Sequence, residues 1–340
     1  MSLQKRSVLI AAFSTVVEWY DFTLYIYLST VMARVFFGGG EASLLAALAG
    51  FAIAYLMRPI GALAFGWFGD RRGRRTAMLW SMTIMSLAMA ATAALPTYEQ
   101  AGAWSGVMLL LLRCVMGFSV GGEYTGVVAY LLESAPEHRR GLVASLASAA
   151  SEIGALLAVA AAATVVHLFS PKALDEWAWR LPFALGAVLA GLVWIARSQM
   201  AESPEFERQR RTASIPQAPL LHILSRHKAA VARGFAISAL GSVTYYVGIT
   251  YAPAFMTGAG GLSEGRALWL ATLAALAVIV ITPVVGFWSD SIGRKPVLIT
   301  LCIASAIAPI GLFSLLSDAQ GGAALIGVLA LAMIAGGVSA

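Results

Sequence analysis

The chain has 340 residues, of which 59% are hydrophobic and 12% are charged. Soluble domains carry about 25% charged residues, so charges this sparse cannot cover the surface of a soluble protein of this length. The composition therefore predicts a polytopic helical membrane protein. The excess of 23 Lys and Arg over 17 Asp and Glu indicates basic loops on one side of the membrane rather than a nucleic-acid surface.

Apolar runs separated by polar breaks predict ten membrane spans, each near or above the ~20 residues that cross a bilayer. The first follows Lys5 and Arg6 but is too long for a signal peptide and carries Glu18 and Asp21, so it is expected to be an uncleaved helix. In chain order the spans are expected near 8–36, 43–67, 76–95, 104–132, 142–168, 180–197, 230–256, 267–288, 297–316 and 322–340.

Basic residues predict the orientation of these spans. If the N-terminus is cytoplasmic, 17 of the 23 Lys and Arg fall in cytoplasmic segments, which is a strong positive-inside bias. We therefore expect a multi-pass protein of the plasma membrane, the inner membrane in a bacterium, with a cytoplasmic N-terminus.

A charged stretch from Arg197 to Lys228 contains three prolines and divides the chain. It predicts an N-terminal six-helix bundle at 1–197, a cytoplasmic linker at 198–229 and a C-terminal bundle at 230–340 that ends within the tenth span. Residues 66–75 recur in degenerate form at 286–295, each time between the second and third spans of a half. An internal repeat on this scale indicates a transporter.

The pattern G-x-x-x-D-R-x-G-R-R at 66–75 resembles the cytoplasmic loop motif of the major facilitator superfamily. The stretches 17–22, 58–61, 117–124 and 133–141 resemble its metabolite:proton symporter branch. The resemblance implies an all-α fold of two six-helix bundles, of which this chain holds about ten of twelve spans. It also implies proton-coupled uptake of an organic acid or of a zwitterion such as proline or betaine.

The repeated loop motif is expected to gate transport. Its glycines permit a close helix approach and a tight turn, and its Asp can accept hydrogen bonds from a helix N-terminus or an Arg. With Glu133 and Arg140, it is expected to form a network that stabilises the outward-facing state. The gating residues predicted in this way are Gly66, Asp70, Arg71, Gly73, Arg74, Glu133, Arg140, Asp290, Gly293 and Arg294.

Four spans each carry a charge at one depth. Glu18, Arg58, Glu123 and Glu152 lie 10–12 residues from the nearest cytoplasmic marker, hence roughly 15–18 Å into the membrane, near the middle of a core about 30 Å thick. Asp21 and Tyr25 follow Glu18 at i+3 and i+7 and share its helix face.

Buried charges in a membrane usually face a cavity and pair with one another. We expect Arg58 to bind a substrate carboxylate together with Glu123 and Tyr25. Proton coupling is assigned to Glu18, Asp21, Glu152 and Arg113, although Arg113, about 30 Å from Glu133, equally suits an outer salt bridge. The alternative is that these charges form packing salt bridges, such as Arg58 with Asp21.

Other functions fit the sequence less well. A G-x-S-x-G pattern at 117–121 lies in mid-span without a His nearby, so an enzyme is not expected. No cofactor or metal is expected; the partners are a small-molecule substrate, protons and the bilayer, and the protein is expected to be a monomer. A proton-coupled exporter remains an alternative, although the fifth span lacks the proline of the export motif. A non-transporting membrane sensor on the same fold is a second alternative.

Overall fold

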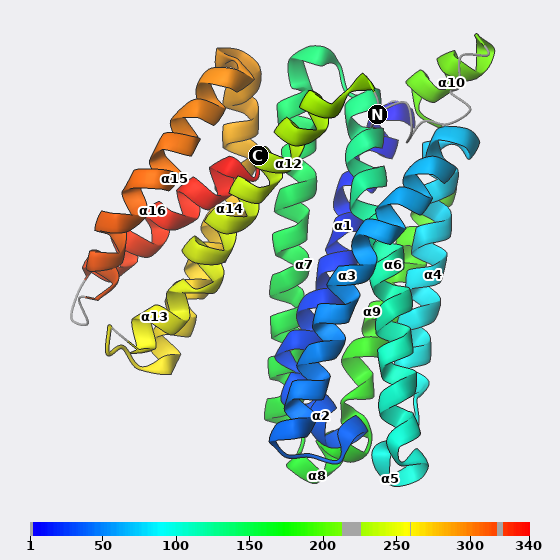
Figure 1. Ribbon diagram of the computed structural model, residues 1–340, viewed down its shortest axis with the longest axis vertical. Coiled ribbons are helices and arrows are strands. Elements are labelled where there is room, and N and C mark those ends of the chain that lie inside the picture. Colours follow the sequence, from blue (N-terminus) through cyan, green and yellow to red (C-terminus); the bar gives the residue numbers. More distant parts are fainter. Residues whose placement is uncertain (1–2, 213–225, 259, 318–321) are drawn as a thin grey trace. The chain divides into compact units, whose positions relative to one another are not determined.

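The computed structural model of the chain describes residues 3–212, 226–258, 260–317 and 322–340. It divides into two compact units (Figure 1). The first unit comprises residues 1–134 and 153–217, and the second comprises residues 135–152 and 218–340. Part of the predicted linker, 213–225, lies outside the described residues. The bundle boundaries at 197 and 230 stay a prediction.

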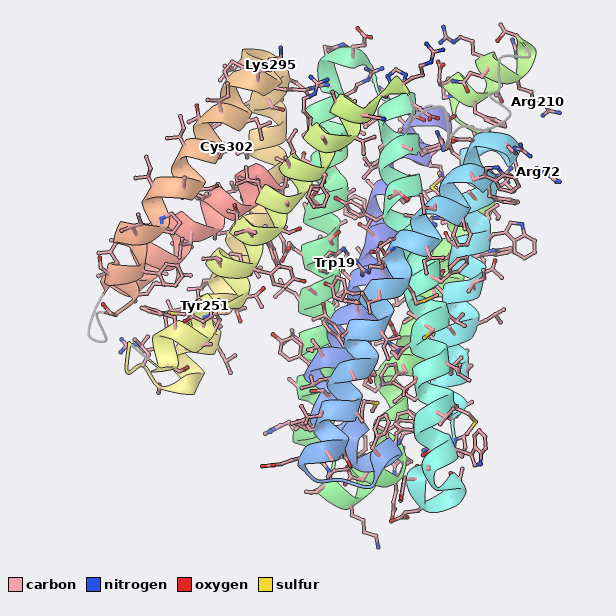
Figure 2. The ribbon with its side chains drawn as sticks, in the orientation of Figure 1. Trp19, Arg72, Arg210, Tyr251, Lys295 and Cys302 are labelled. Atoms are coloured by element: carbon pink, nitrogen blue, oxygen red, sulfur yellow. The ribbon has the colours of Figure 1, made fainter. Side chains whose placement is uncertain are left out.

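The first unit is built from long helices joined by short turns. Its elements are α1 (Leu3–Tyr27), α2 (Ser29–Phe37), α3 (Glu41–Arg72), α4 (Arg74–Ala94), α5 (Tyr98–Ala101), α6 (Ala103–Ser134), the later part of α7 (Arg140–Leu168), α8 (Pro171–Ala173), the π-helical turn η2 (Leu174–Ala178), α9 (Arg180–Ser198) and α10 (Pro204–Arg211). Figure 2 shows Arg72 and Arg210, two of the basic residues that the sequence places on the cytoplasmic side, at the same end of this unit.

The second unit begins with the 3-10 turn η1 (Glu137–Arg139) and the early part of α7. It continues with α12 (Lys228–Tyr245), the π-helical turn η3 (Tyr246–Thr250), α13 (Ala252–Gly258), α14 (Glu264–Ile292), α15 (Arg294–Leu316) and α16 (Gly322–Val338). Lys295 and Tyr251 mark opposite ends of this unit in Figure 2.

The predicted helical spans are confirmed. Among the described residues, nine helices are long and apolar enough to cross a membrane, and α16 is a shorter apolar helix at the tenth predicted span. The first span differs in detail from its prediction: α1 ends at Tyr27 and the chain resumes as α2 at Ser29. The seventh span, likewise, is interrupted by the π-helical turn η3 before α13.

Glycines bring α3 and α6 into backbone contact. A Cβ atom added to Gly61 would lie 1.8 Å from the carbonyl oxygen of Phe118, and one added to Gly117 would lie 2.1 Å from that of Ala54. A Cβ on Gly121 would lie 2.0 Å from the carbonyl oxygen of Arg58. Small residues permit this approach in membrane bundles, and here it holds the backbone of Arg58 against α6.

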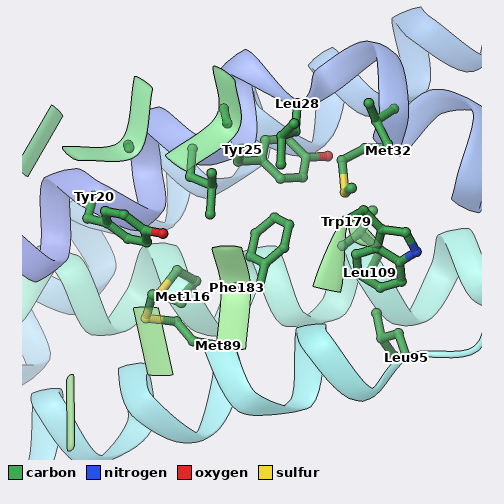
Figure 3. Close-up of a cluster of buried hydrophobic side chains, with 14 of the residues drawn as sticks. Tyr20, Tyr25, Leu28, Met32, Met89, Leu95, Leu109, Met116, Trp179 and Phe183 are labelled. Carbon is green, nitrogen blue, oxygen red and sulfur yellow. The ribbon is translucent and has the colours of Figure 1, made fainter. Parts of the chain in front are cut away.

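A hydrophobic core fills the space between α1, α2, α4, α6 and α9 (Figure 3). Tyr20, Met32, Trp179 and Phe183 are fully buried in it, and the hydroxyl of Tyr20 donates to the carbonyl oxygen of Pro182 at 2.9 Å. This packing fixes one face of α1, so that the acids on the rest of the helix are held in place.

We predict that Gly61→Ala destabilises the protein, because two helix backbones have to separate to admit the methyl group. Overpacking of this kind costs about 1–3 kcal/mol. Thermal unfolding of the purified protein in detergent measures the effect. Gly191→Ala on α9 is the control, since a Cβ there meets nothing within 4 Å; equal melting temperatures for the two variants would contradict the packing described.

Candidate functional site

Three acidic side chains inside the first unit each face a different arginine. Glu18 and Asp21 on α1 and Glu123 on α6 are all at most 1% exposed. Their partners, in the same order, are Arg58 on α3, Arg113 on α6 and Arg197 on α9. The three pairs differ in whether the arginine is hydrogen-bonded to both carboxylate oxygens, which we call closed, or to neither, which we call open.

The Glu123–Arg197 pair is fully enclosed. Arg197 Nη1 donates to Glu123 Oε2 at 2.8 Å, and Nη2 donates to Oε1 and to the hydroxyl of Ser14. Ser81 Oγ donates to Glu123 Oε2 at 2.7 Å, and Arg197 Nη1 also donates to the carbonyl oxygen of Met78 at 2.9 Å. Because both carboxylate oxygens are engaged, this pair locks α6 to α9, α1 and α4.

The Asp21–Arg113 pair is also closed. Arg113 Nη1 donates to Asp21 Oδ2 at 2.9 Å and Nη2 to Oδ1 at 3.4 Å. The ring of Tyr25 lies 4.7 Å from the guanidinium carbon of Arg113, while its hydroxyl donates to the carbonyl oxygen of Ala47 at 2.9 Å. Tyr25 therefore belongs with Arg113 rather than with Arg58.

The Glu18–Arg58 pair is open. The closest nitrogen and oxygen are 3.6 Å apart, and within the described part of the chain neither carboxylate oxygen of Glu18 accepts a hydrogen bond. Arg58 is 20% exposed at its side chain and rests on the rings of Phe22 and Tyr55, at 4.3 and 4.7 Å from the ring centroids. Figure 2 labels Trp19, the neighbour of Glu18, well inside the length of α1. Glu18 is thus a buried carboxylate whose hydrogen-bonding capacity is unused.

The observed pairing differs from the sequence-based alternative, which joined Arg58 to Asp21. Asp21 pairs with Arg113 instead. Arg197 was missed altogether, because it was counted among the basic loop residues, yet its side chain is 1% exposed. The sequence feature that could have indicated a buried Arg197 is its position in the last turn of an apolar helix, from which a long side chain can reach into the bundle.

Glu152 lies on the part of α7 that belongs to the second unit. The residue is 7% exposed, and the hydroxyl of Tyr245 donates to Glu152 Oε2 at 3.1 Å. The structure therefore does not group Glu152 with the three ion pairs of the first unit, and its part in proton coupling stays a prediction.

The first copy of the loop motif forms a network with residues beyond the motif. Arg74 contacts Asp70 at 2.7 Å and donates through Nε to Glu133 at 3.0 Å. Ser203, which caps α10, donates to Glu133 Oε2 at 2.6 Å. Glu202 accepts the backbone N–H of Arg75 at 2.9 Å. Glu202 and Ser203 were not foreseen, because nothing in the sequence pairs the segment before α10 with the motif.

The glycines of this copy do different things. Gly73 has φ of 104°, which only glycine adopts readily, and it makes the turn from α3 to α4. Gly66 was expected to permit a close helix approach, but a Cβ there would meet nothing within 4 Å. Arg71 lies over the ring of Trp67 at 4.5 Å.

The second copy of the motif contacts the start of α7 within the second unit. Asp290 accepts the backbone N–H groups of Gly141 and Leu142 at 2.8 and 2.9 Å, so a carboxylate meets the positive end of a helix. Gly286, the counterpart of Gly66, does make a close approach, since its Cβ would lie 2.3 Å from Ser145 Oγ.

The remaining residues of the second copy complete the turn. Gly293 has φ of 106°, and Arg294 lies 3.5 Å from Asp290. Arg140, in the same unit, lies 3.9 Å from Glu137 in an exposed pair. Its expected part in a network with Glu133 stays a prediction.

The matched family is the Major Facilitator Superfamily, whose model covers residues 10–340. The alpha-ketoglutarate permease of Escherichia coli K12 is 34% identical over 95% of this chain and 74% of its own length. The ectoine/proline transporter ProP of Corynebacterium glutamicum is 34% identical over 94% and 66%, and the citrate-proton symporter of Klebsiella pneumoniae is 30% identical over 92% and 70%. The chain thus spans about two thirds to three quarters of the length of these relatives.

The fold has a counterpart among solved structures. The proton:xylose symporter XylE of E. coli, bound to 6-bromo-6-deoxy-D-glucose, matches with a TM-score of 0.79 at 22% identity, over 99% of this chain and 81% of that one. That likeness supports the fold, while the apolar helices, the family match and the relatives named as transporters define a multi-pass membrane transport protein, not an enzyme. The chain belongs to the Major Facilitator Superfamily.

We predict that Arg197→Leu destabilises the first unit by about 3–5 kcal/mol, because it leaves the Glu123 carboxylate buried without a counter-charge. Replacing both members, in Arg197→Leu/Glu123→Leu, should recover most of that loss, because apolar pairs substitute well for buried ion pairs. Thermal or denaturant unfolding in detergent compares the two. A single variant as stable as the double variant would show that Glu123 does not depend on Arg197.

Proposed function

We propose that the protein is a proton-coupled symporter that takes up a small carboxylate-containing metabolite by alternating access. The observation that carries this proposal is the open Glu18–Arg58 pair, in which a buried acid that accepts no hydrogen bond from the described residues lies beside a partly exposed cation. In support, the relatives include a permease for alpha-ketoglutarate and a citrate-proton symporter. We further propose a bacterial inner membrane, a cytoplasmic N-terminus and a monomer.

Glu18 and a substrate carboxylate would compete for the same cation. When Glu18 is ionised, Arg58 is partly neutralised by it; when Glu18 takes up a proton, Arg58 becomes available to the substrate. Proton binding and substrate binding then favour each other, which is the reciprocal coupling that symport requires. Asp21 and Glu123 are less suited to this role, because Arg113 and Arg197 already occupy their oxygens.

The size of this coupling can be bounded. Two unit charges about 4 Å apart attract by about 4 kcal/mol at an effective dielectric constant of about 20, and the pair here is separated by 3.6 Å. Since 1.4 kcal/mol is a factor of ten, loss of the Glu18 charge can raise substrate affinity by up to about a thousandfold. That is enough for a pH gradient to drive accumulation.

Glu18→Gln is predicted to uncouple transport. Where Glu18 is ionised in the empty protein, wild-type affinity for substrate should rise about tenfold for each unit that pH falls, because one proton binds with the substrate. In Glu18→Gln this dependence should vanish, and proteoliposomes should keep substrate counterflow but lose pH-driven accumulation. Glu99→Gln, at an exposed acid on α5, is the matched control. Full pH-driven accumulation by Glu18→Gln would contradict the assignment.

Asp70→Asn is predicted to slow transport without reducing the amount of protein in the membrane. The Asp70–Arg74 pair is partly exposed, and pairs of that kind contribute at most about 1 kcal/mol to stability, so the fold should persist. Initial uptake rates, normalised to immunoblotted membrane protein, measure the effect. An unchanged normalised rate would argue against a gating role for the motif.

A further inference from the structure

The surroundings of Arg58 are aromatic. Trp19 and Phe22 on α1 and Phe51 and Tyr55 on α3 form an aromatic cluster, in which Phe22 lies 4.5 Å from both Phe51 and Tyr55 and 6.1 Å from Trp19 between ring centroids. The guanidinium of Arg58 rests on this cluster at 4.3 Å from Phe22, 4.7 Å from Tyr55 and 5.9 Å from Trp19. The rings therefore already hold a cation.

Polar atoms without hydrogen bonds gather at the same place. Within the described residues, both carboxylate oxygens of Glu18, Nε1 of Trp19, and Nε and Nη2 of Arg58 are buried and make no hydrogen bond. Buried polar groups are normally hydrogen-bonded, so a cluster of exceptions needs an explanation. A polar ligand that binds here would supply both the missing acceptors and the missing donors.

The charges around Arg58 restrict which kind of ligand can bind there. Arg113 and Arg197 are bonded to Asp21 and Glu123, which leaves Arg58 as the one cation of the three ion pairs able to receive an anion. Next to Arg58 lie ring faces, which carry partial negative charge, attract cations and repel anions. Arg58 can thus receive a carboxylate, and the ring faces that Arg58 now covers can receive a cation in its place.

We propose that the substrate is a zwitterion with an alkylated ammonium group close to its carboxylate, rather than a di- or tricarboxylate. This proposal deepens the proposed symport function and rests on it. On binding, the substrate carboxylate pairs with Arg58, and the guanidinium moves off the ring faces. The alkylated ammonium then occupies the place of the guanidinium on the aromatic cluster. One cation replaces another on the rings, and Glu18 remains free to carry the proton.

A second carboxylate would meet the wrong surroundings. With Arg58 already paired, it would lie against the ring faces and the Glu18 side chain. Neither compensates a negative charge, and the next arginines are bonded within their own pairs. The charged spans of the first unit are therefore suited to a substrate whose own charges cancel.

Two ligands of nearly equal shape test the proposal on the wild-type chain. Glycine betaine and 3,3-dimethylbutanoate differ in that a quaternary nitrogen replaces a quaternary carbon, so only the first carries a cation. We expect titration calorimetry of the purified full chain to show betaine binding about tenfold or more tighter, as a desolvated cation–π contact provides. Proline, 2-oxoglutarate and citrate complete the panel, in binding and in uptake by proteoliposomes with and without a pH gradient.

Ring variants locate the contact. Tyr55→Leu and Phe22→Leu should lower the preference for betaine over its carbon analogue several-fold, while Tyr55→Phe, which keeps the ring, should retain it. Phe169→Leu is the matched control, because Phe169 packs on Trp177 away from the cluster. Should the Leu variants fail to fold, the comparison of the two ligands on the wild type still decides.

The outcomes separate this inference from the proposed function. Equal affinity for betaine and its carbon analogue, or pH-driven accumulation of 2-oxoglutarate or citrate without betaine or proline, would overturn the zwitterion and leave carboxylate symport standing. Betaine binding and exchange that no pH gradient drives would overturn proton coupling and leave the substrate class standing. If none of the panel is bound or transported, both proposals fail.

Discussion

An ionised side chain inside a membrane bundle has to find its counter-charge within the protein, because hydrocarbon supplies none and the cost is about 2.5–3.5 kcal/mol or more for each unpaired charge. The first unit meets this constraint with three acid–arginine pairs. Two of them, Asp21–Arg113 and Glu123–Arg197, are hydrogen-bonded on both oxygens and join helices. In the third, Glu18–Arg58, no hydrogen bond to the carboxylate is present among the described residues. Arg58 can therefore exchange Glu18 for another partner at the lowest cost of the three arginines.

The packing of α1, α3 and α6 explains why the Glu18–Arg58 pair is not hydrogen-bonded as the other two pairs are. The glycines of α6 bring its backbone against the backbone of Arg58, and the core around Tyr20 and Trp179 fixes α1. With both helices held, the side chain of Arg58 lies on the aromatic cluster rather than in a two-point bond to Glu18. The geometry that leaves the carboxylate unsatisfied is thus a consequence of close helix contact on one side and bulky rings on the other.

The sequence predicted the fold well because its signals are local. Apolar runs mark the spans, and the motif at 66–75 indicated the family, which the comparisons confirm. Pairing of charges could not be predicted in the same way, because depth along a helix says nothing of the direction in which a side chain points. Asp21 turned toward Arg113, and Arg197, counted as a loop cation, reached inward to Glu123. Gly66 and Gly286 share a motif position, yet only Gly286 is in close contact.

The central claim is that Glu18 and the substrate carboxylate compete for Arg58, so that a proton binds when substrate binds. Proton uptake on substrate addition, followed with a pH indicator in weakly buffered solution, tests this directly. For the purified wild-type protein at a pH where Glu18 is ionised, the account predicts uptake that approaches one proton for each substrate bound, and none for Glu18→Gln. Substrate binding without proton uptake in the wild type, or equal uptake in both proteins, would contradict it.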